Sequence, residues 1–557
     1  MTTLVPKFEQ TATNAINRTS TSKLAERISV WDFIPVGTNT SIVDCTDFIQ
    51  SAVNYITTLG GGTLYFPTGT YLLVGKHSPM TNDSRLVDGV TLTSNITIEG
   101  DGNGSIIKVD INCANGFVFG RFRTAITTSA ANINNVIIRD IQFSRATATF
   151  EQQQYQVWID SAENVMIENV YFNGWSGDAI YIGAILNSDT SAWLQSLTDN
   201  IQITNCIFDG IDNNNRQAIT VFSGTNIEIS NNLIKNTTRS DMPGAIDLEP
   251  ELTTNLIQNI SIYDNTFNNI GGATGVISLA LGANLTNKAF NIAVYNNKFF
   301  STANAYVFFA NGIAQSTNVF PTNAPYEIIF DNNLCTHNQG GLFYVAGINN
   351  SKVTNNHFAT TGGQAIISNF TSSYYQTQNL FVSNNTFYSC TVNSTTNTAA
   401  PLILVNGTLI NASIDNNNFI LCGIYNTSTS TFGGMQVFGI SGSGGSMASA
   451  YISVKDNIVN GAGNSYTSTD PVFYVYPYTT LTNANTFSMF NNSIIGAYKE
   501  AGDLGSLYTQ ANSYIVNGPV YLIPQAVPSN PKAGEIYYDI TANKPYCWNG
   551  SSWNALF

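Results

Sequence analysis

Charged residues are scarce in this sequence. Only 10% of its 557 residues are Asp, Glu, Lys or Arg, and the formal net charge is −14. Nucleic acids and anionic membranes are bound through clustered basic side chains. With just 21 Lys and Arg residues and no basic run, the composition argues against a nucleic acid or a membrane surface as the partner.

Patterns for metal sites, disulfides and membrane spans are missing as well. The three histidines (His77, His337 and His357) lie far apart, and the seven cysteines are scattered, odd in number and without a CxxC pair. Such cysteines are typical of buried free thiols in a protein that folds in a reducing compartment. We therefore expect no metal and no cofactor. Neither an apolar run of about 18 residues nor a secretion signal is present.

A repeat dominates what the sequence does contain. From about residue 90, an Asn, an alternating strand, a pair of Asn or Asp residues and an apolar residue recur roughly every 25 to 40 positions, which is typical of a solenoid. The copies read NITIEGDG, NVIIRDIQF, NVMIENVYF, NIQITNCIF, NIEISNNLI, NISIYDNTF, NIAVYNNKF, YEIIFDNNL, SKVTNNHF, NLFVSNNTF, NASIDNNNF, YISVKDNIV and FSMFNNSII.

Short alternating strands joined by Asn-rich corners predict an all-β solenoid. Asn tolerates the left-handed backbone that a tight corner requires, and its amide can bond along a stack of equivalent corners. Each copy is too short to bury its own apolar face, so neighbouring copies must stack. About a dozen rungs spaced by about 4.8 Å predict a rod on the order of 60 Å long.

The composition divides the chain into four parts. Residues 1–30 are polar and predict a neck or linker, and residues 31–90 predict a capping helix around Asp44 to Ile56 and the first strands, with a break at Pro67 and Gly69. Residues 91–513 form the predicted solenoid. Residues 514–557 predict a small C-terminal β-module, with turns at 542–543 and 549–550, that caps the solenoid or supports trimerisation.

One pair of carboxylates marks a candidate catalytic site. Asp247 and Glu249 are two residues apart in an apolar strand, so both point to the same side. Like charges at this range raise each other's pKa and favour one shared proton. Glycoside hydrolysis requires this arrangement. Glu251 follows Pro250 and is a weaker, peripheral candidate.

Aligning three rungs extends the site. The segments AIYIG (179–183), AITVF (218–222) and AIDLE (245–249) place Ile180, Ile219 and Ile246 in one inward column and Ile182, Val221 and Leu248 in the next. The predicted groove, about three rungs or roughly 10 Å tall, is walled by Asp178, Tyr181, Arg216, Gln217, Thr220, Asp247 and Glu249. Asp178 is a third catalytic candidate.

Aromatic side chains near these rungs are candidate sugar platforms, since aromatic faces stack on sugar rings. They are Trp175, Tyr181 and Trp193. We expect Arg216 and Gln217 to orient the sugar, and Arg216 to keep one carboxylate ionised.

The motifs together resemble a known family. The polar neck, ISVWDF, GGGTLYFPTGTY, the Asn-rich rungs, NNNRQAI and GAIDLEPE are similar to phage tailspike depolymerases of the pectate-lyase-like, right-handed parallel β-helix type. The neck VPKFEQTATNAINR is similar to that of tailspikes from phages that infect Acinetobacter. In this family the segment after ISV usually reads DFGAVGDGVTDD, whereas here it reads DFIPVGTNTSIVDC.

The resemblance implies a homotrimer on the virion tail, attached through its N-terminus, that cleaves a bacterial capsular polysaccharide outside the host cell. Two alternatives stay open. A polysaccharide lyase would need a base such as Tyr181 or Arg216, with acidic residues to hold Ca²⁺. A receptor-binding adhesin would bind the polysaccharide without cleaving it.

Overall fold

The computed structural model describes most of the chain. The described residues are 7–8, 18–19, 27–75, 87–119, 133–183, 198–281, 285–304, 306–312, 324–338, 340–363, 366–368, 376–394, 402–406, 408–409, 411–428, 431–432, 438–441, 451–461, 473–475, 486–495, 524–525, 527, 531, 535–539 and 541–556. Most of the predicted neck, residues 1–30, lies outside them; its strands β1 (Lys7–Phe8) and β2 (Arg18–Thr19) pair in antiparallel fashion.

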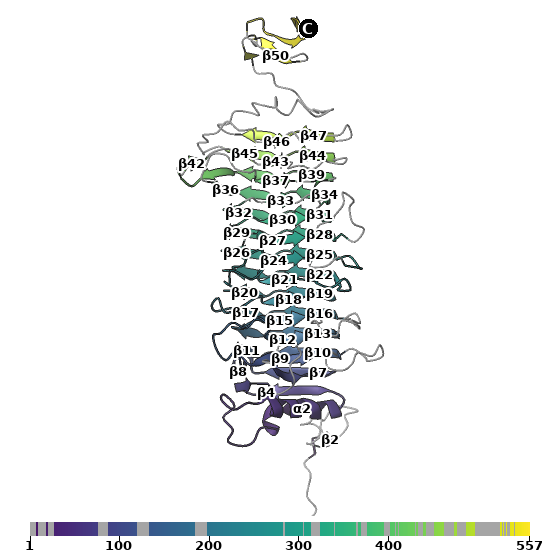
Figure 1. The fold of residues 1–557 in the computed structure, drawn as a ribbon, viewed down its shortest axis with the longest axis vertical. Coiled ribbons are helices and arrows are strands. Elements are labelled where there is room, and N and C mark those ends of the chain that lie inside the picture. The colour runs from purple at the N-terminus through teal and green to yellow at the C-terminus, as the bar shows by residue number, and fades with distance from the viewer. Residues whose placement is uncertain are drawn as a thin grey trace, which may run out of the picture.

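Three long parallel sheets run the length of the rod in Figure 1. The 16-stranded sheet contains β3 (Arg27–Ser29), β4 (Gly62–Phe66), β7 (Ile96–Gly100), β10 (Ile133–Arg139), β13 (Ala162–Glu168), β16 (Asp199–Thr204), β19 (Gly224–Ser230), β22 (Ile257–Tyr263), β25 (Phe290–Tyr295), β28 (Tyr326–Asp331), β31 (Asn349–Thr354), β34 (Gln376–Ser383), β38 (Thr408–Leu409), β39 (Asn411–Asp415), β44 (Tyr451–Lys455) and β47 (Thr486–Phe490).

The 14-stranded sheet contains β5 (Gly69–Leu73), β8 (Ser105–Val109), β11 (Gln142–Arg145), β14 (Tyr171–Asn173), β17 (Ile207–Asp209), β20 (Leu233–Lys235), β23 (Thr266–Asn268), β26 (Lys298–Phe300), β29 (Leu334–Asn338), β32 (His357–Thr361), β35 (Thr386–Tyr388), β40 (Asn418–Ile420), β45 (Ile458–Asn460) and β48 (Ser493–Ile495).

The 13-stranded sheet, hereafter the site sheet, contains β6 (Val87–Thr91), β9 (Cys113–Phe119), β12 (Tyr155–Ile159), β15 (Asp178–Ile182), β18 (Ile219–Val221), β21 (Ile246–Leu248), β24 (Gly275–Ala280), β27 (Tyr306–Asn311), β30 (Phe343–Ala346), β33 (Ile366–Ser368), β37 (Ile403–Asn406), β43 (Phe438–Ser441) and β46 (Phe473–Val475). Each rung supplies one strand to each of the three sheets. The fold is a right-handed, single-stranded parallel β-helix, as predicted.

Asparagines shape the corners between the strands. Asn226, Asn259 and Asn291 have φ of 53°, 54° and 55°, in the left-handed region. Their amides bond from rung to rung: the Nδ2 of Asn259 donates to the Oδ1 of Asn226 at 3.0 Å, and that of Asn291 to Asn259 at 3.0 Å. The corner role that the sequence predicts for Asn is confirmed.

A second ladder of asparagines lies inside the rod. Its members are Asn232, Asn265, Asn297, Asn333, Asn356, Asn385, Asn417, Asn457 and Asn492. The Asn297 Oδ1 accepts both the backbone N–H and the side-chain amide of Asn265, each at 3.0 Å. Its Nδ2 donates to the Ile262 carbonyl at 2.8 Å. The interior polar groups of the corner are therefore satisfied by the next rungs.

Apolar stacks fill the remaining interior. The rings of Phe172 and Phe208 stack with centroids 4.7 Å apart, and those of Phe267 and Phe299 do the same. All seven cysteines are free thiols. Six are buried as predicted, and Cys547 is half-buried.

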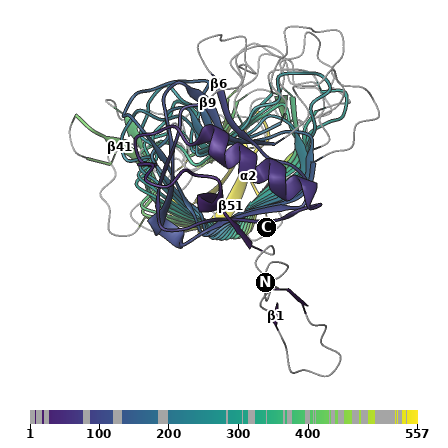
Figure 2. The ribbon, with the colours of Figure 1, turned by 90° about the horizontal axis from the view of Figure 1, so that it is seen from below.

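A helix closes the N-terminal end of the rod. α2 (Thr46–Thr58) follows the short η1 (Val30–Asp32) and buries Ile49, Ala52, Val53 and Ile56. Figure 2 shows it lying across the end of the solenoid. The helix was predicted around Asp44 to Ile56, two residues early at each end.

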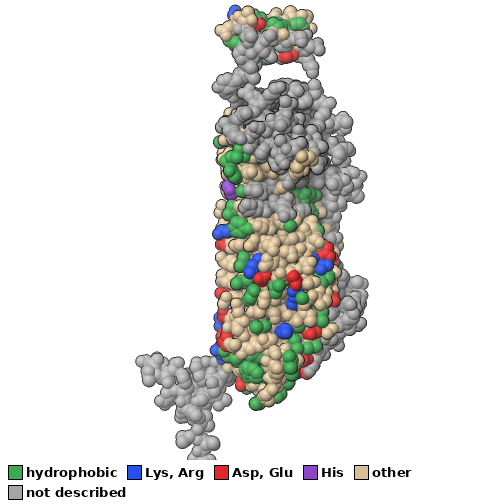
Figure 3. All heavy atoms as spheres, turned by 90° about the vertical axis from the view of Figure 1, so that its left-hand side faces the viewer, with side chains coloured by type: hydrophobic (Ala, Val, Ile, Leu, Met, Phe, Trp, Pro, Cys, Tyr) green, Lys and Arg blue, Asp and Glu red, His purple; other side chains and the backbone are tan. Residues whose placement is uncertain are grey.

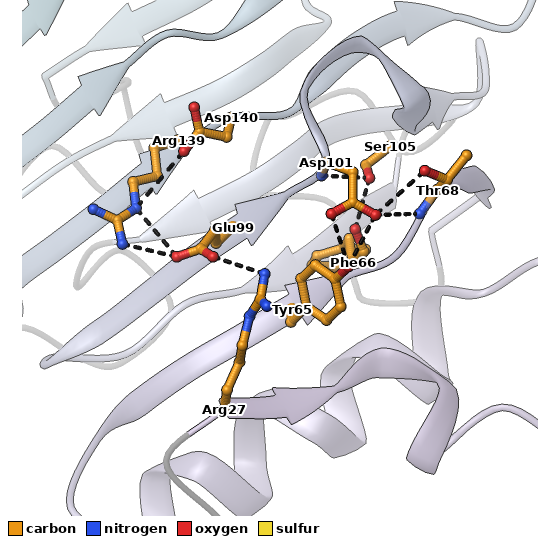
Figure 4. Close-up of polar contacts among 9 residues, drawn as sticks. All are labelled: Arg27, Tyr65, Phe66, Thr68, Glu99, Asp101, Ser105, Arg139 and Asp140. Atoms are coloured by element: carbon orange, nitrogen blue, oxygen red, sulfur yellow. Dashed lines mark hydrogen bonds and ion pairs between the residues drawn. The ribbon is translucent and has the colours of Figure 1, made fainter. Parts of the chain in front are cut away.

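Charged side chains join the first rungs on the outer face (Figure 4). Glu99 accepts from Arg27 and Arg139, each at 2.8 Å. The Arg27 guanidinium lies 3.4 Å from the centroid of the Tyr65 ring, and the Tyr65 hydroxyl donates to Asp101 at 2.7 Å. Asp101 belongs to the turn that carries η2 (Gly102–Gly104). Elsewhere, on the face shown in Figure 3, charges are sparse.

Two small sheets complete the described structure. β36 (Thr391–Ser394), β41 (Gly423–Asn426) and β42 (Thr431–Phe432) form one of them. β49 (Pro524–Gln525), β50 (Ile536–Asp539), β51 (Lys544–Trp548) and β52 (Trp553–Ala555) form the other, with the predicted turns between β50, β51 and β52. None of the helices in the described residues has the length and apolarity needed to span a membrane.

Candidate active site

Three neighbouring strands of the site sheet carry the predicted residues. β15 pairs with β18, and β18 with β21, so that Ile180, Ile219 and Ile246 form one fully buried column. Tyr181, Thr220 and Asp247 form the adjacent column on the opposite side of the sheet. The register that the sequence alignment predicts is the observed one.

Backbone geometry places Glu249 beside Asp247. The Glu249 N–H still donates to the Val221 carbonyl at 3.0 Å, so the extended pairing continues one residue beyond β21. Pro250 has no N–H and ends it. Alternate residues of an extended strand point the same way, so Asp247 and Glu249 share one side.

Hydrogen bonds between rungs hold the buried carboxylates. The Gln217 Nε2 donates to the Asp247 Oδ2 at 3.0 Å. The Thr220 Oγ1 donates to the Asp178 Oδ2 at 3.0 Å, and the Arg216 Nε lies 3.9 Å from the Asp178 Oδ1. Each contact links one rung to the next, so the rigid stacking of the solenoid fixes the positions of these groups.

Burial of these polar groups is deeper than predicted. Asp178, Gln217, Thr220 and Asp247 are at most 1% exposed, whereas the sequence indicated that they wall an open groove. Glu249 alone of the three candidate catalytic carboxylates is partly exposed. One oxygen each of Asp178 and Gln217 has no hydrogen-bond partner. Leaving a buried polar group unpaired costs about 1–3 kcal/mol, so such groups call for an explanation by function.

The three carboxyls have raised pKa values. Burial raises the pKa of Asp178 to about 6, although Arg216 and the Thr220 hydrogen bond lower it. Burial, then the nearby charge of Glu249, raises the pKa of Asp247 well above its usual range. Burial also raises the pKa of Glu249, against the opposing effects of Arg216 and a hydrogen bond with Asp247. Of the three carboxyls, Asp247 is thus the one whose protonated form burial favours most.

Carboxyls that are buried and close enough to affect each other's ionisation are common in catalytic sites.

Neither a protein-family model nor a characterised protein matches the chain by sequence. Solved structures do match it by shape. One is the tailspike protein of E. coli bacteriophage HK620 with one glutamate replaced, in complex with pentasaccharide. It has a TM-score of 0.55 and 17% identity, and the match covers 88% of this chain and 83% of the HK620 chain.

An HK620 variant with both an aspartate and a glutamate replaced, also in complex with pentasaccharide, has the same TM-score of 0.55 at 15% identity, covering 92% of this chain and 84% of its own. The chain has the fold of the phage tailspikes. Tailspike protein 3 of bacteriophage CBA120 matches 99% of this chain and 72% of its own length at 13% identity, with a TM-score of 0.48.

Within this tailspike fold, aromatic rings pack below the carboxylates. Tyr155, Trp158, Tyr181 and Phe222 form a cluster separate from the main core, with Tyr155 and Tyr181 centroids 4.6 Å apart. Tyr181 is only 7% exposed. Trp175 is fully buried in the main core against Phe208, so it does not present a ring to a ligand in this structure. Trp193 lies outside the described residues, and Glu251 is exposed.

Arg145 contacts the loops beside the candidate site, and the sequence analysis did not assign it there. Its Nη1 donates to the carbonyls of Trp175 and Asn214 at 3.3 and 3.2 Å, and its Nη2 pairs with Asp212. These bonds hold the loop that leads into Arg216. A lone basic residue two rungs away from a charged loop gives too weak a signal to find from the sequence alone.

The described residues contain no group of three or more His, Cys, Asp and Glu side chains arranged to hold a metal ion. His77 lies outside the described residues. Among the described residues of these rungs, the three carboxyls, Arg216 and Gln217 are the candidates for chemistry.

Replacing Asp247 by asparagine is expected to stabilise the protein at pH 7. The folded-state pKa is raised, so folding keeps a proton that the unfolded carboxyl releases above a pH of about 4. This contribution to stability is complete at low pH and is lost as pH rises toward the folded-state pKa. Asn is neutral throughout, so the free energy of unfolding should rise by on the order of 1 kcal/mol.

Thermal unfolding midpoints of the wild type and Asp247→Asn, measured at pH 7 and again at a pH of about 3, which lies below the pKa of the unfolded carboxyl, check this. The gain should vanish at the lower pH. An equal gain at both pH values would show that the substitution acts through packing rather than through the proton.

Proposed function

We propose that the chain is a phage tailspike that binds and depolymerises a bacterial capsular polysaccharide by hydrolysing glycosidic bonds. The supporting observation is the set of three buried or half-buried carboxyls with raised pKa values on neighbouring rungs, held by Gln217, Thr220 and Arg216. By analogy, the HK620 tailspike of the same fold is seen with pentasaccharide bound. The protein would act as a homotrimer on the virion tail, attached through its N-terminus, at the host surface.

Asp247 and Glu249 together act as the general acid in this proposal. Asp247 holds the proton, because its pKa is raised the most, and Gln217 fixes the carboxyl by bonding its other oxygen. Glu249 is partly exposed and receives the hydrogen bond from Asp247, so the proton reaches the leaving oxygen of the sugar through Glu249. A protonated carboxyl of this kind is what glycosidic cleavage needs.

Asp178 acts as the base or nucleophile. Thr220 and Arg216 stabilise its ionised form, so it is charged above a pH of about 6. Arg216 also reaches the surface, since its side chain is 16% exposed, and would orient the sugar together with Gln217. One protonated and one ionised carboxyl then face the same glycosidic bond.

Cleavage by β-elimination has less support. It needs a base that is free to lose its proton, and the sequence offered Tyr181 and Arg216 for that role. Although burial lowers the pKa of Arg216, the charge of Asp178 raises it above its usual value, so the guanidinium keeps its proton. Burial raises the pKa of Tyr181, and the neighbouring Tyr155 and Asp178 raise it further, so its hydroxyl is hard to ionise.

Fragment mass tests the proposed function. The purified protein is incubated with a panel of capsular polysaccharides, and the products are weighed by mass spectrometry. Fragments that have gained water mean hydrolysis. Fragments without added water, with a new ultraviolet absorbance, mean a lyase, and intact polymer with retained binding means an adhesin.

The pH profile of hydrolysis should have an acidic limb near pH 6. Asp178 must be ionised to act, and its pKa is about 6, so kcat/KM should rise about tenfold per pH unit below that value and level off above it. Initial rates on a capsular polysaccharide that the protein cleaves, measured across the acidic range, give the limb. If the acidic limb is unchanged in Asp178→Asn, it arises from the titration of another group.

A further inference from the structure

The column that holds Asp247 continues upward into aromatic residues. Asp247 pairs with Ser278, Ser278 with Phe309, and Phe309 with Tyr344. At about 4.8 Å per rung, Phe309 lies about 10 Å and Tyr344 about 14 Å from Asp247 along the axis of the solenoid. All four side chains leave the site sheet on the side away from the core.

Three rings lie together on these upper rungs. The centroids of Phe309 and Tyr344 are 4.6 Å apart with an interplanar angle of 17°, and the Tyr306 centroid lies 5.1 Å from that of Tyr344 and 6.0 Å from that of Phe309. We call Tyr306, Phe309 and Tyr344 the aromatic platform.

The platform differs from the rings below the carboxylates in exposure. Trp158 and Tyr181, in the same column but lower, are 1% and 7% exposed, whereas all three platform rings are only half-buried. Most large apolar side chains on this rod are packed away, so a group of three half-exposed rings in line with the carboxylates marks a binding surface.

An amide oxygen without a hydrogen-bond partner lies on the same side of the sheet as the rings. Asn311 is two residues after Phe309 in β27 and therefore points to the same side. Its Oδ1 is buried yet has no hydrogen-bond partner. An acceptor without a donor costs about 1–3 kcal/mol, and a hydroxyl group of a ligand would relieve it.

We propose that the aromatic platform and Asn311 form a distal subsite for sugar rings of the same polysaccharide chain that is cleaved at Asp247 and Glu249. The inference rests on the proposed function. The rings stack on the apolar faces of the sugars, and the Asn311 Oδ1 accepts from a sugar hydroxyl. The polysaccharide consequently lies along the axis of the solenoid, with the platform a few sugar residues from the bond that breaks.

The test separates long from short substrates. Phe309→Ser and Tyr344→Ser, singly and together, place in the column the residue that Ser278 already supplies one rung below, so the backbone should accept them. We expect the double variant to raise KM for the polymer about 10- to 100-fold, with kcat and the KM for oligosaccharides too short to reach the platform unchanged. Asn311→Ala should raise the polymer KM in the same selective way.

Phe381→Ser is the matched control, because Phe381 is 37% exposed on β34, in another sheet. An unchanged polymer KM in the double variant, with wild-type cleavage intact, overturns the subsite alone. Loss of trimers in sedimentation with an unchanged KM instead makes the platform an interface between copies.

Failure of the proposed function is recognised separately, by the absence of cleavage in the wild type. The dissociation constant for capsular polysaccharide then decides the subsite: a 10- to 100-fold weakening in the double variant supports it, and equal or undetectable binding in wild type and variant overturns it.

Discussion

Glu249→Gln and Asp247→Asn should each lower kcat for polysaccharide cleavage by about 10²- to 10⁴-fold, which is the usual contribution of a general acid. Glutamine at 249 keeps the shape of the side chain that reaches the surface but cannot pass a proton to the leaving oxygen. Asparagine at 247 keeps an oxygen to accept the hydrogen bond from Gln217 while removing the proton that the pair shares. KM should change little in either variant, because the proton matters only in the transition state.

Product release from a defined capsular polysaccharide, followed by reducing-end assay and mass spectrometry, measures this loss. Asp264→Asn is the control. Asp264 is an exposed corner residue with φ of 54°, and Asn occupies the equivalent left-handed corners at 231 and 296, so its activity should equal that of the wild type. Full activity in both site variants would move the catalytic site elsewhere on the chain. Because Asp247→Asn is expected to be the more stable protein, its inactivity could not be ascribed to unfolding.

Asn297→Ala should reduce the free energy of unfolding by at least about 3 kcal/mol. The substitution leaves the backbone N–H and the side-chain amide of Asn265 without their acceptor, and the Ile262 carbonyl without its donor. Each buried group left unpaired costs about 1–3 kcal/mol. No water can replace the amide without opening the rod, since Asn297 is only 1% exposed.

Urea unfolding followed by intrinsic fluorescence measures the difference. Asn268→Ala serves as the matched control, because Asn268 is exposed at the end of β23 and its loss should change stability by less than about 0.5 kcal/mol. Similar small losses in both variants would mean that the interior ladder can be interrupted without penalty, and that apolar stacking carries the stability of the rungs.

Local repeats explain why the sequence predicted the fold so well. The Asn corners and the alternating apolar residues recur in every rung, and the alignment of Ile180, Ile219 and Ile246 is the observed register. Whether a side chain on the outer face is open to solvent depends on what packs over it, which no rung encodes. For this reason the burial of Asp247 and of Trp175 was not foreseen.

The residues that complete the site were harder to find. Arg145 acts through loop carbonyls that come close only in three dimensions. Phe309 and Tyr344 lie in strands without the Ala-Ile pattern that aligned the lower rungs, so their place in the Asp247 column required the observed strand pairing. The proposed roles of the carboxylates themselves remain predictions that the kinetics of the variants will decide.

The position of α2 has a consequence for how the protein behaves at high concentration. A stack of parallel strands exposes unpaired backbone groups at its end, and a second stack can add to them to build a growing fibril. The amphipathic helix α2 lies across the first rungs with its apolar face buried against them. It therefore occupies the position where another molecule would have to add its strands. The helix thus blocks the addition of further strands at this end, so the rod, although it is stacked like a fibril, does not grow from it.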